Sequence, residues 1–503
     1  MPNVYTLTDR PLRPGDKELF GWRRKAQTLA LNILTYDLSQ AALTVGVQGD
    51  WGAGKTSFIN LVLDGLGEDR TPQAREKGFK VKNWQEKYPL AARVSVRYRE
   101  MGEETKYSLV IPFDCWMMSH LPFGGMGLVL YLLAVLEDFV AAMTGEEGKK
   151  GTALQAFVRY AETAGRLLET TGDVLGLLGV PGAEAAGWGI RHLIEQVGQK
   201  AQARLQASEI EEAFRALVGL QDTFRLLVEQ VRQIPPFSRG DTRLVVVVDD
   251  LDRVPPRTAL EITEKLKLFL DVPYTVFIIG ADMEVVARGL QERFGGETSV
   301  AEGRDYINKI VRLSYPVPRM TRRDAYALLA VSDAICHALY EARFSRWRNE
   351  EPQREEEFPG TFVDELLFIL PNTGYNPRNL KKIALAFGVY RAFFLDSLNQ
   401  RGWEVLDADN AKATYFRLLA LAILYQYNLE LAKAFHQYLV ERTDAGEREE
   451  PFNGERARAF LQQKEVNALL EDPSAVERFF AKMAEKEYTI GEWLRAFAYT
   501  SGA

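Results

Sequence analysis

The sequence predicts an α/β fold with a parallel sheet, followed by an all-helical C-terminal region. Three observations support this prediction. Segments 42–48 and 243–249 are apolar and rich in β-branched residues, as expected for strands that are buried on both faces of a parallel sheet. A glycine-rich turn and then an amphipathic segment follow the first of them. After residue 320 strand signals fade, and Ala/Leu/Phe-rich helical patterns continue to Thr500.

The glycine-rich turn matches the pattern G-x-x-x-x-G-K-[ST]. Its residues are Gly49, Asp50, Trp51, Gly52, Ala53, Gly54, Lys55, Thr56 and Ser57. The pattern is informative only between a strand and a helix, and it has that context here: strand 42–48 precedes it and an amphipathic run at 56–65 follows. We therefore predict that these nine residues form a nucleotide-binding loop.

The chemistry of a triphosphate explains these residue types. The three glycines let backbone N–H groups converge on a dense anion without Cβ clashes. The positive end of the following helix points at the same phosphates. Lys55 is predicted to act as a catalytic residue on the β/γ oxygens, and Thr56 to bind Mg²⁺ through its hydroxyl group. For Trp51, stacking on the base and bracing of the loop against a neighbouring hairpin are both open, and bracing is favoured.

Carboxylates follow the second buried strand, where ligands of parallel sheets gather. Asp249 ends the strand, and we predict that it binds Mg²⁺ together with Thr56. Asp250 is predicted to position the attacking water. Two adjacent carboxylates need a cation or hydrogen bonds to be ionised together, which favours a metal here. For Asp252 and Arg253 a local ion pair or a helix cap is the favoured interpretation, and a functional role for Asp252 is the less favoured one.

Further candidates lie outside these two motifs. Asp282 follows the predicted strand 274–280, and it is either a catalytic sensor of the γ-phosphate or the cap of the next helix. Asn376 and Pro377 predict a helix start, which would hold Arg378 in the first turn as a catalytic contact to the γ-phosphate or as a surface residue. Three more cations are candidates for an arginine-finger role across a subunit interface: Arg304, Lys309 and Arg312.

The other elements are assigned by periodicity and turn residues. The predicted elements are a helix at 22–38, an exposed excursion at 66–88, a hairpin-like pair at 92–98 and 107–113, mostly helical structure at 125–235 interrupted at 172–187, and a helix at 259–270 capped by Thr258. The predicted domains are an arm and helix (1–40), the first part of the core (41–124), a helical insertion (125–238), the second part of the core (239–318), a helical lid (319–395) and a C-terminal helical domain (396–503).

The composition indicates an ordinary globular chain. It has 503 residues, 47% hydrophobic and 26% charged, and a net charge of −7 that provides no global basic field for nucleic acid. Two isolated cysteines, Cys115 and Cys336, give no zinc framework or disulfide scaffold and suit a reducing cytoplasm, the expected location. The apolar runs 126–136 and 174–183 are too short to span a membrane, so no transmembrane segment is predicted. A shallow membrane contact at 172–190 is the alternative.

The two motifs together resemble the KAP family of P-loop NTPases. The tryptophan inside the loop and the string Asp249, Asp250, Leu251, Asp252 and Arg253 carry the resemblance. Weaker similarities lie at 9–12, 113–116, 277–282, 306–311 and 376–382, so the resemblance covers about residues 5–390. It implies an AAA+-like core with an additional strand and a helical lid. It also implies a link to phage exclusion and defence, and in many members membrane helices between the two motifs.

Motifs and resemblance together predict a Mg²⁺-dependent nucleoside triphosphatase that acts as a switch on a protein effector or through self-assembly. ATP is the expected substrate, although the residues do not decide between ATP and GTP. The first alternative is a nucleotide-binding module that hydrolyses little and serves assembly. A DNA-engaged ATPase is a further alternative that the acidic balance disfavours.

Overall fold

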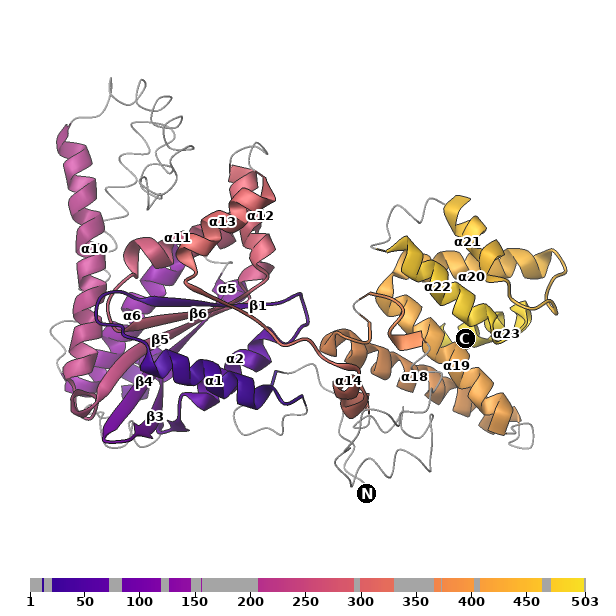
Figure 1. Cartoon of the computed structure of the whole chain (residues 1–503), viewed down its shortest axis with the longest axis horizontal. Helices are drawn as coiled ribbons and strands as arrows, with labels where there is room; N and C mark the ends of the chain where they lie inside the picture. The colour runs from indigo at the N-terminus through magenta and orange to yellow at the C-terminus, as the bar shows by residue number, and fades with distance from the viewer. Residues whose placement is uncertain are drawn as a thin grey trace. The chain divides into compact units, whose positions relative to one another are not determined.

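A computed structural model of the chain describes residues 11–12, 20–71, 84–118, 126–145, 155, 207–293, 299–329, 366–371, 373–401, 408–463 and 472–501. The chain divides into two compact units (Figure 1). One unit contains Pro11–Trp51 and Lys55–Val317, and we call it the core unit. The other contains Pro318–Ala503 and also takes in loop residues Gly52–Gly54, and we call it the C-terminal unit.

A seven-stranded sheet forms the centre of the core unit, in the order β2-β3-β4-β5-β6-β1-β7. The strands are Leu43–Gln48 (β1), Glu68–Asp69 (β2), Ser95–Met101 (β3), Glu104–Asp114 (β4), Asp241–Asp249 (β5), Thr275–Ala281 (β6) and Leu313–Pro316 (β7). All neighbours from β4 to β7 pair in parallel, whereas β2, β3 and β4 pair antiparallel. The sheet is therefore mixed and mostly parallel, as predicted.

Strand β6 lies between β1 and β5, the two strands that carry the predicted motifs. Ile278 of β6 pairs with Val45 of β1 on one side and with Val247 of β5 on the other. The additional strand that the family resemblance implied is thus present. Because all three strands are parallel, their carboxyl ends meet at one edge of the sheet. This topology brings residues 49–56 and 249–252 to that edge.

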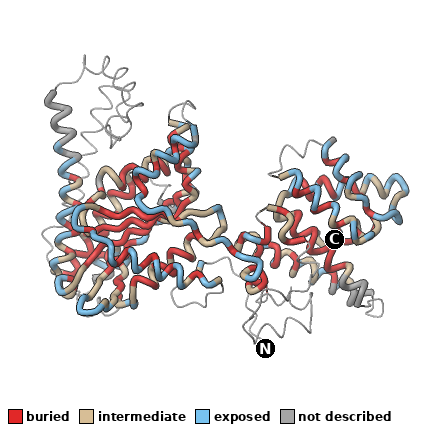
Figure 2. The backbone as a smooth tube through the Cα atoms, in the orientation of Figure 1, coloured by how far each residue is buried: buried red, intermediate tan, exposed pale blue. Residues whose placement is uncertain are grey.

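Helices cover both faces of the sheet. Helices α1 (Trp22–Thr35) and α2 (Lys55–Gly65) bury apolar side chains on one face against Val45, Val247 and Ile278. The apolar positions of α1 recur every three or four residues and form one stripe. In Figure 2 the central strands β1, β5 and β6 are coloured almost entirely as buried. Burial on two faces explains their unbroken apolar sequences.

The other face is covered by helices from the predicted insertion and from the second part of the core. They are α6 (Met126–Thr144), α10 (Ala207–Gln233), α11 (Pro256–Phe269), α12 (Met283–Arg293) and α13 (Val300–Ile310). Leu132 of α6 and Phe224 of α10 are fully buried in the same cluster as Phe277 of β6. The described part of the insertion is therefore a layer on the sheet. Short helical segments complete the unit: Trp84–Lys87 (α4), Pro89–Arg93 (η1), Cys115–Met118 (α5), Phe237–Arg239 (η3) and Leu251–Arg253 (η4).

The hairpin prediction is confirmed, and three other local predictions need correction. β3 and β4 form an antiparallel pair whose second strand enters the core sheet. Thr258 does not cap α11, because that helix already begins at Pro256. The 66–88 segment is not purely an exposed excursion, since it contains the edge strand β2 and the fully buried Tyr88. Strand β7 was not predicted, because its four residues end in proline and form an edge strand with little buried surface.

Helix α6 is long and apolar enough to cross a membrane by length and composition. The apolar run 126–136 was judged too short to span a membrane, but the helix that contains it continues to Thr144 and reaches that length. Asp138 is 8% exposed and accepts a hydrogen bond from Leu90 N at 3.3 Å. Most of α6 is buried inside the core unit. A buried core helix of a globular domain can have the same length and apolar composition as a membrane-spanning helix. The segment 172–190 lies outside the described residues.

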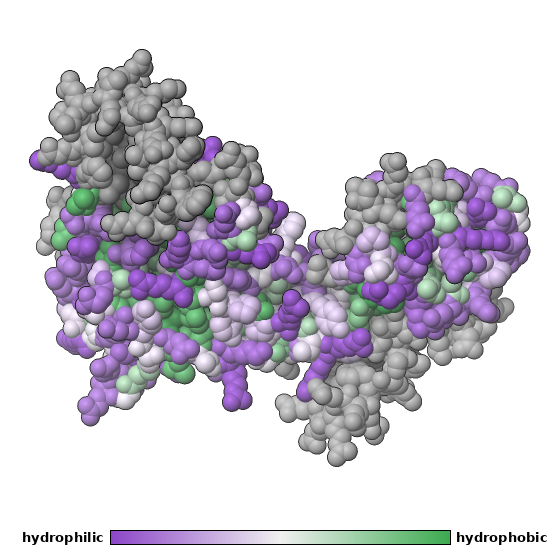
Figure 3. All heavy atoms as spheres, turned by 45° about the horizontal axis from the view of Figure 1, so that its top comes forward, coloured by the Kyte–Doolittle hydropathy of each residue, from purple (hydrophilic) through white to green (hydrophobic). Residues whose placement is uncertain are grey.

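The C-terminal unit is helical in the described residues that follow Pro318. Its helices are α14 (Arg322–Leu329), α18 (Pro377–Arg401), α19 (Ala408–Tyr427), α20 (Leu429–Asp444), α21 (Gly454–Gln463), α22 (Pro473–Ala484) and α23 (Ile490–Ser501). Phe435 and Trp493 lie at the centre of its aromatic core. Helix α18 runs across the predicted boundary at 395/396, so lid and C-terminal domain share an element. On the face in Figure 3, hydrophilic side chains cover most of the described surface.

Candidate nucleotide-binding site

The phosphate-loop motif connects β1 to α2, as predicted. Gly52 and Gly54 have φ angles of 85° and 95°, in the left-handed region that favours glycine. Helix α2 begins at Lys55 itself, so its unpaired N–H groups open onto the loop. No acidic residue occupies the first turn of α2. The loop therefore presents backbone donors and a positive helix end, which is the arrangement that binds phosphate.

Lys55 is folded back over its own loop. Its Nζ donates to Gly49 O at 2.8 Å, to Asp50 O at 3.2 Å and to Asp252 Oδ2 at 2.8 Å. An ammonium group has three protons, and these contacts use all of them. Lys55 is only 8% exposed, so this cation is held in the interior by partners that a phosphate could replace.

The carboxylate of Asp249 lies at the adjacent end of β5, next to Thr56. Burial raises the pKa of Asp249 to about 6; the hydrogen bond with Thr56 opposes this rise, and the neighbouring charge of Asp250 adds to it. Asp249 Oδ1 also accepts the N–H of Asp250 at 2.9 Å. A buried carboxylate beside a hydroxyl group is the oxygen-ligand set that Mg²⁺ prefers, so these residues fit that ion.

The raised pKa of Asp249 predicts a stability effect. Its folded-state pKa lies above the ordinary 3.8, so stability falls as the pH rises from about 4 to about 6. Without metal or nucleotide at pH 7.5, we expect Asp249→Asn to be more stable than the wild type by about 1–3 kcal/mol. Urea unfolding at pH 4.5 and 7.5 should show that this advantage shrinks at the lower pH. A less stable variant at pH 7.5 would contradict the assignment.

Gly280 of β6 leaves room for the Asp249 carboxylate. A Cβ atom at this position would lie 2.6 Å from Asp249 Oδ1 and 2.8 Å from Ile59 Cδ1. We expect Gly280→Ala to destabilise the protein by about 1–3 kcal/mol and to weaken Mg²⁺-dependent nucleotide binding, because the carboxylate must move. Calorimetric titration with and without Mg²⁺ measures the second effect. The control is Gly219→Ala in α10, where nothing lies within 4 Å; equal losses in both variants would refute the prediction.

Asp250 has an unusual backbone and a nearby cation. Its φ angle is 57°, in the left-handed region, and its Oδ1 pairs with Arg253 Nε at 2.8 Å. Burial raises its pKa, whereas Arg253 lowers it. The guanidinium of Arg253 also lies 5.8 Å from the ring centre of Trp116. Asp250 is thus next to the predicted metal ligand, with its charge balanced by a residue three positions later.

Asp252 is not part of a local ion pair or a helix cap, and the favoured sequence interpretation was wrong. Its carboxylate pairs with Lys55, 197 positions earlier, and accepts the N–H of Asp282 at 3.2 Å. It is Arg253 that forms a local pair, with Asp250. No signal in the sequence selects Asp252 as the partner of Lys55, because sheet order decides the contact.

Asp282 caps the start of α12 in this structure. Its Oδ1 accepts the N–H of Glu284 at 3.0 Å, and its own N–H donates to Asp252. Of the two interpretations that the sequence left open, the structure shows the helix cap. The backbone contact to Asp252 also places Asp282 at the edge of the Lys55 site, and a sensor role stays a prediction.

The predicted start of α18 is present in the C-terminal unit. Asn376 Oδ1 accepts the N–H groups of Arg378 at 3.0 Å and of Asn379 at 3.2 Å, and Pro377 is the first helical residue. Gly52 belongs to the same unit, where an added Cβ would lie 2.8 Å from Asn376 Oδ1 and 2.9 Å from Arg378 Cβ. Glycine at position 52 is therefore required by space as well as by its φ angle.

The structure also shows the surroundings of two other loop residues, Trp51 and Ser57. Trp51 is 70% exposed, so it does not brace the loop by burial as favoured. The hydroxyl group of Ser57 accepts the N–H of Leu12 at 3.1 Å, and Asn60 donates to Leu12 O at 2.7 Å. Ser57 thus holds the segment before α1. Among the candidate finger residues, Arg304 forms an ion pair with Glu284.

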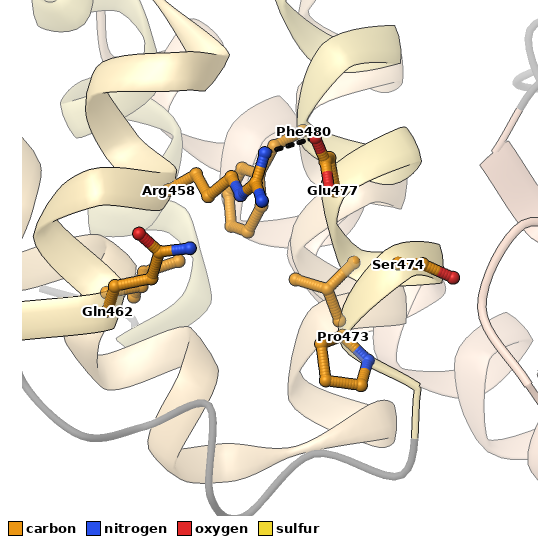
Figure 4. Close-up of a pocket in the computed structure, with 8 residues that line it drawn as sticks. Arg458, Gln462, Pro473, Ser474, Glu477 and Phe480 are labelled. Carbon is orange, nitrogen blue, oxygen red and sulfur yellow. Dashed lines mark hydrogen bonds and ion pairs between the residues drawn. The ribbon is translucent and has the colours of Figure 1, made fainter.

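A separate pocket of about 240 Å³ lies between α21 and α22 of the C-terminal unit (Figure 4). Arg458, Gln462, Pro473, Ser474, Glu477 and Phe480 are among the residues that line it. Arg458 forms an ion pair with Glu477 across it, so its cation is already neutralised by a carboxylate. No glycine-rich loop lines this pocket, and its lining residues do not resemble those of the phosphate-loop site.

The sheet order, the loop and the acidic strand end define a P-loop nucleotide-binding protein. The KAP family P-loop domain matches residues 24–394, and the chain belongs to this family. The chain is similar to the phage T7 exclusion protein of Escherichia coli (strain K12), with 22% identity over 315 residues. That match covers 60% of this chain and 34% of the relative, so the chain spans about a third of that protein.

A likeness among solved structures is also found. The chain resembles the Aeropyrum pernix ORC2 protein, determined as ADPNP and ADP complexes, with 12% identity and a TM-score of 0.33. The match covers 96% of this chain and 90% of that chain.

Proposed function

We propose that the protein is a Mg²⁺-dependent nucleoside triphosphatase, with ATP as the substrate, that acts as a regulatory switch. One observation carries the proposal. Lys55 and Thr56 at the start of α2 lie with Asp249 at one edge of the sheet, although 193 positions separate Thr56 from Asp249. Each of these groups matches a different part of a metal-bound triphosphate.

Each residue has a separate task. The amides of the loop and Lys55 bind the β/γ oxygens and stabilise their charge. Thr56 and Asp249 would hold Mg²⁺, and the bound ion would supply positive charge that neutralises the phosphates. Asp250 accepts a hydrogen bond from the attacking water and orients it. Arg378, Asp282 and the exposed Trp51 remain candidates for contacts to the γ-phosphate and the base.

The metal and the nucleotide are expected to bind together. In the described part of the chain, no group of three or more His, Cys, Asp or Glu is arranged to hold a metal ion. Mg²⁺ is commonly bound by one or two protein ligands together with substrate phosphates. We therefore expect weak binding of Mg²⁺ alone and tight binding of Mg²⁺ together with ATP.

The family and its phage-exclusion relative support a role in bacterial antiviral defence. In that role the nucleotide state would alter an interaction with a protein effector or with other copies of the chain in the cytoplasm. The experiment is ATP hydrolysis and binding by the intact protein with Mg²⁺ and with EDTA. Saturable, Mg²⁺-dependent turnover is expected, and absence of both nucleotide binding and turnover overturns the proposal.

A second candidate is a nucleotide-binding assembly module with little hydrolysis. One observation favours it: Lys55 is paired with Asp252, and Asp250 is paired with Arg253, so two of the predicted catalytic groups are engaged within the chain. Single-turnover hydrolysis beside a binding titration separates the two. Binding with a chemical step slower than nucleotide dissociation identifies the module.

A further inference from the structure

The ion pair between Lys55 and Asp252 is buried, and its two residues lie 197 positions apart in the sequence. The atoms Nζ and Oδ2 are 2.8 Å apart, and the two side chains are 8% and 7% exposed. Partial removal from water makes such an interaction much stronger than a surface ion pair. A triphosphate that takes Lys55 must therefore replace this carboxylate.

Asp252 cannot follow Lys55 easily, because two contacts fix it. Its Oδ2 accepts the N–H of Asp282 at 3.2 Å, at the end of the strand that separates β1 from β5. The preceding residue, Leu251, is fully buried. Leu251 and Asp252 both belong to the short η4 turn, which begins directly after the left-handed backbone of Asp250. The carboxylate is thus held in place by the sheet and by packing, independently of Lys55.

We propose that Asp252 is a positioning residue that competes with the nucleotide for Lys55 and thereby limits the affinity of the site. This inference rests on the proposed function and concerns its regulation. Lys55 donates to Asp252 while it is folded onto the carbonyl groups of Gly49 and Asp50. When the phosphates take Lys55, the fixed carboxylate of Asp252 remains nearby and repels them.

Such competition suits a switch. A nucleotide that leaves a carboxylate unpaired beside it dissociates faster than one in a fully complementary site, because the empty site recovers its own ion pair. Asp252 would keep the affinity low enough for the nucleotide to exchange, whereas Asp249 and Thr56 would bind the metal. The two carboxylates, three positions apart, would then have opposite effects on nucleotide binding.

The test is Asp252→Asn in the full chain. Asparagine keeps an oxygen that can accept from Lys55 and from the Asp282 N–H, but it removes the charge. We expect a fluorescent, non-hydrolysable ATP analogue to bind at least about tenfold more tightly, with a correspondingly slower dissociation rate. The change should appear both with Mg²⁺ and with EDTA, because it arises at Lys55.

A matched control is Asp271→Asn. Asp271 also pairs with a lysine, Lys267, and accepts a backbone N–H, from Ala42 at 3.0 Å, but before the start of β1. Its substitution should leave the affinity unchanged. If Asp252→Asn does not fold, judged by its melting curve, Asp252→Ala is measured in its place, with the same expected direction.

The outcomes separate this inference from the proposed function. Unchanged or weaker binding by a folded Asp252 variant, with normal binding by the wild type, overturns the competition and leaves the nucleotide site standing. A purely structural role for Asp252 predicts that weaker binding. Failure of the wild type to bind the analogue, in contrast, overturns the proposed function itself.

Discussion

Lys55→Ala is expected to abolish nucleotide binding at micromolar concentrations and to lower hydrolysis by at least about 10²–10³-fold. The substitution removes the cation that the structure holds among Gly49 O, Asp50 O and Asp252. Titration with the ATP analogue and a steady-state phosphate-release assay measure the two effects.

The same substitution should also destabilise the empty protein. It leaves the Asp252 carboxylate, which is 7% exposed, without its cation, and an unpaired buried charge costs about 3 kcal/mol. Adding Asp252→Asn should restore part of the stability but no binding. This double variant distinguishes loss of the site from loss of the fold.

A control for Lys55→Ala is Lys267→Ala. Lys267 pairs with Asp271 and is 40% exposed, so its loss should change stability little and binding not at all. Full hydrolysis by the Lys55 variant would reject the phosphate-loop assignment, however stable that variant proves to be.

Asp250→Asn is expected to retain nucleotide binding and to lose turnover by about 10²–10⁴-fold. Asparagine is preferable to alanine here, because the φ angle of Asp250 is 57° and asparagine tolerates the left-handed region better than alanine does. The amide removes the carboxylate that we propose orients water but keeps the size of the side chain. Single-turnover kinetics beside an analogue titration give both quantities.

The comparison for Asp250→Asn is Asp241→Asn at the other end of the same strand. Asp241 pairs with Lys106 at 3.0 Å and also with Arg243, so its loss should affect stability and leave the catalytic rate constant unchanged. Equal loss of turnover in both variants would point to general damage of the sheet. Loss of binding in Asp250→Asn alone would assign Asp250 to the metal or phosphates instead.

The positions of the two motifs could be read from the sequence because each depends on local chemistry. The loop needs glycines where φ is positive and a helix start after them, and Gly52, Gly54 and Lys55 provide both. Strand β5 is buried on both faces, which requires its unbroken apolar run before Asp249. The N-cap at Asn376 is likewise a local property of its side chain and the following proline.

Other features were missed or misjudged because their signals are not local. The edge strand β7 is short and ends in proline, and only its pairing with β1 makes it a strand. The length of α6 was underestimated from its apolar run 126–136, because the helix continues past Glu137 to Thr144 and buries Asp138 in the core unit.

The sequence by itself determined that a phosphate loop and an acidic strand end exist in this protein, because each is encoded by neighbouring residues. Only the tertiary structure decided that Asp252 meets Lys55, 197 positions away, and leaves Arg253 to pair locally with Asp250. The reason is physical: both carboxylates follow one strand within three residues, and the turn of the backbone at Asp250 and the sheet order select their cations.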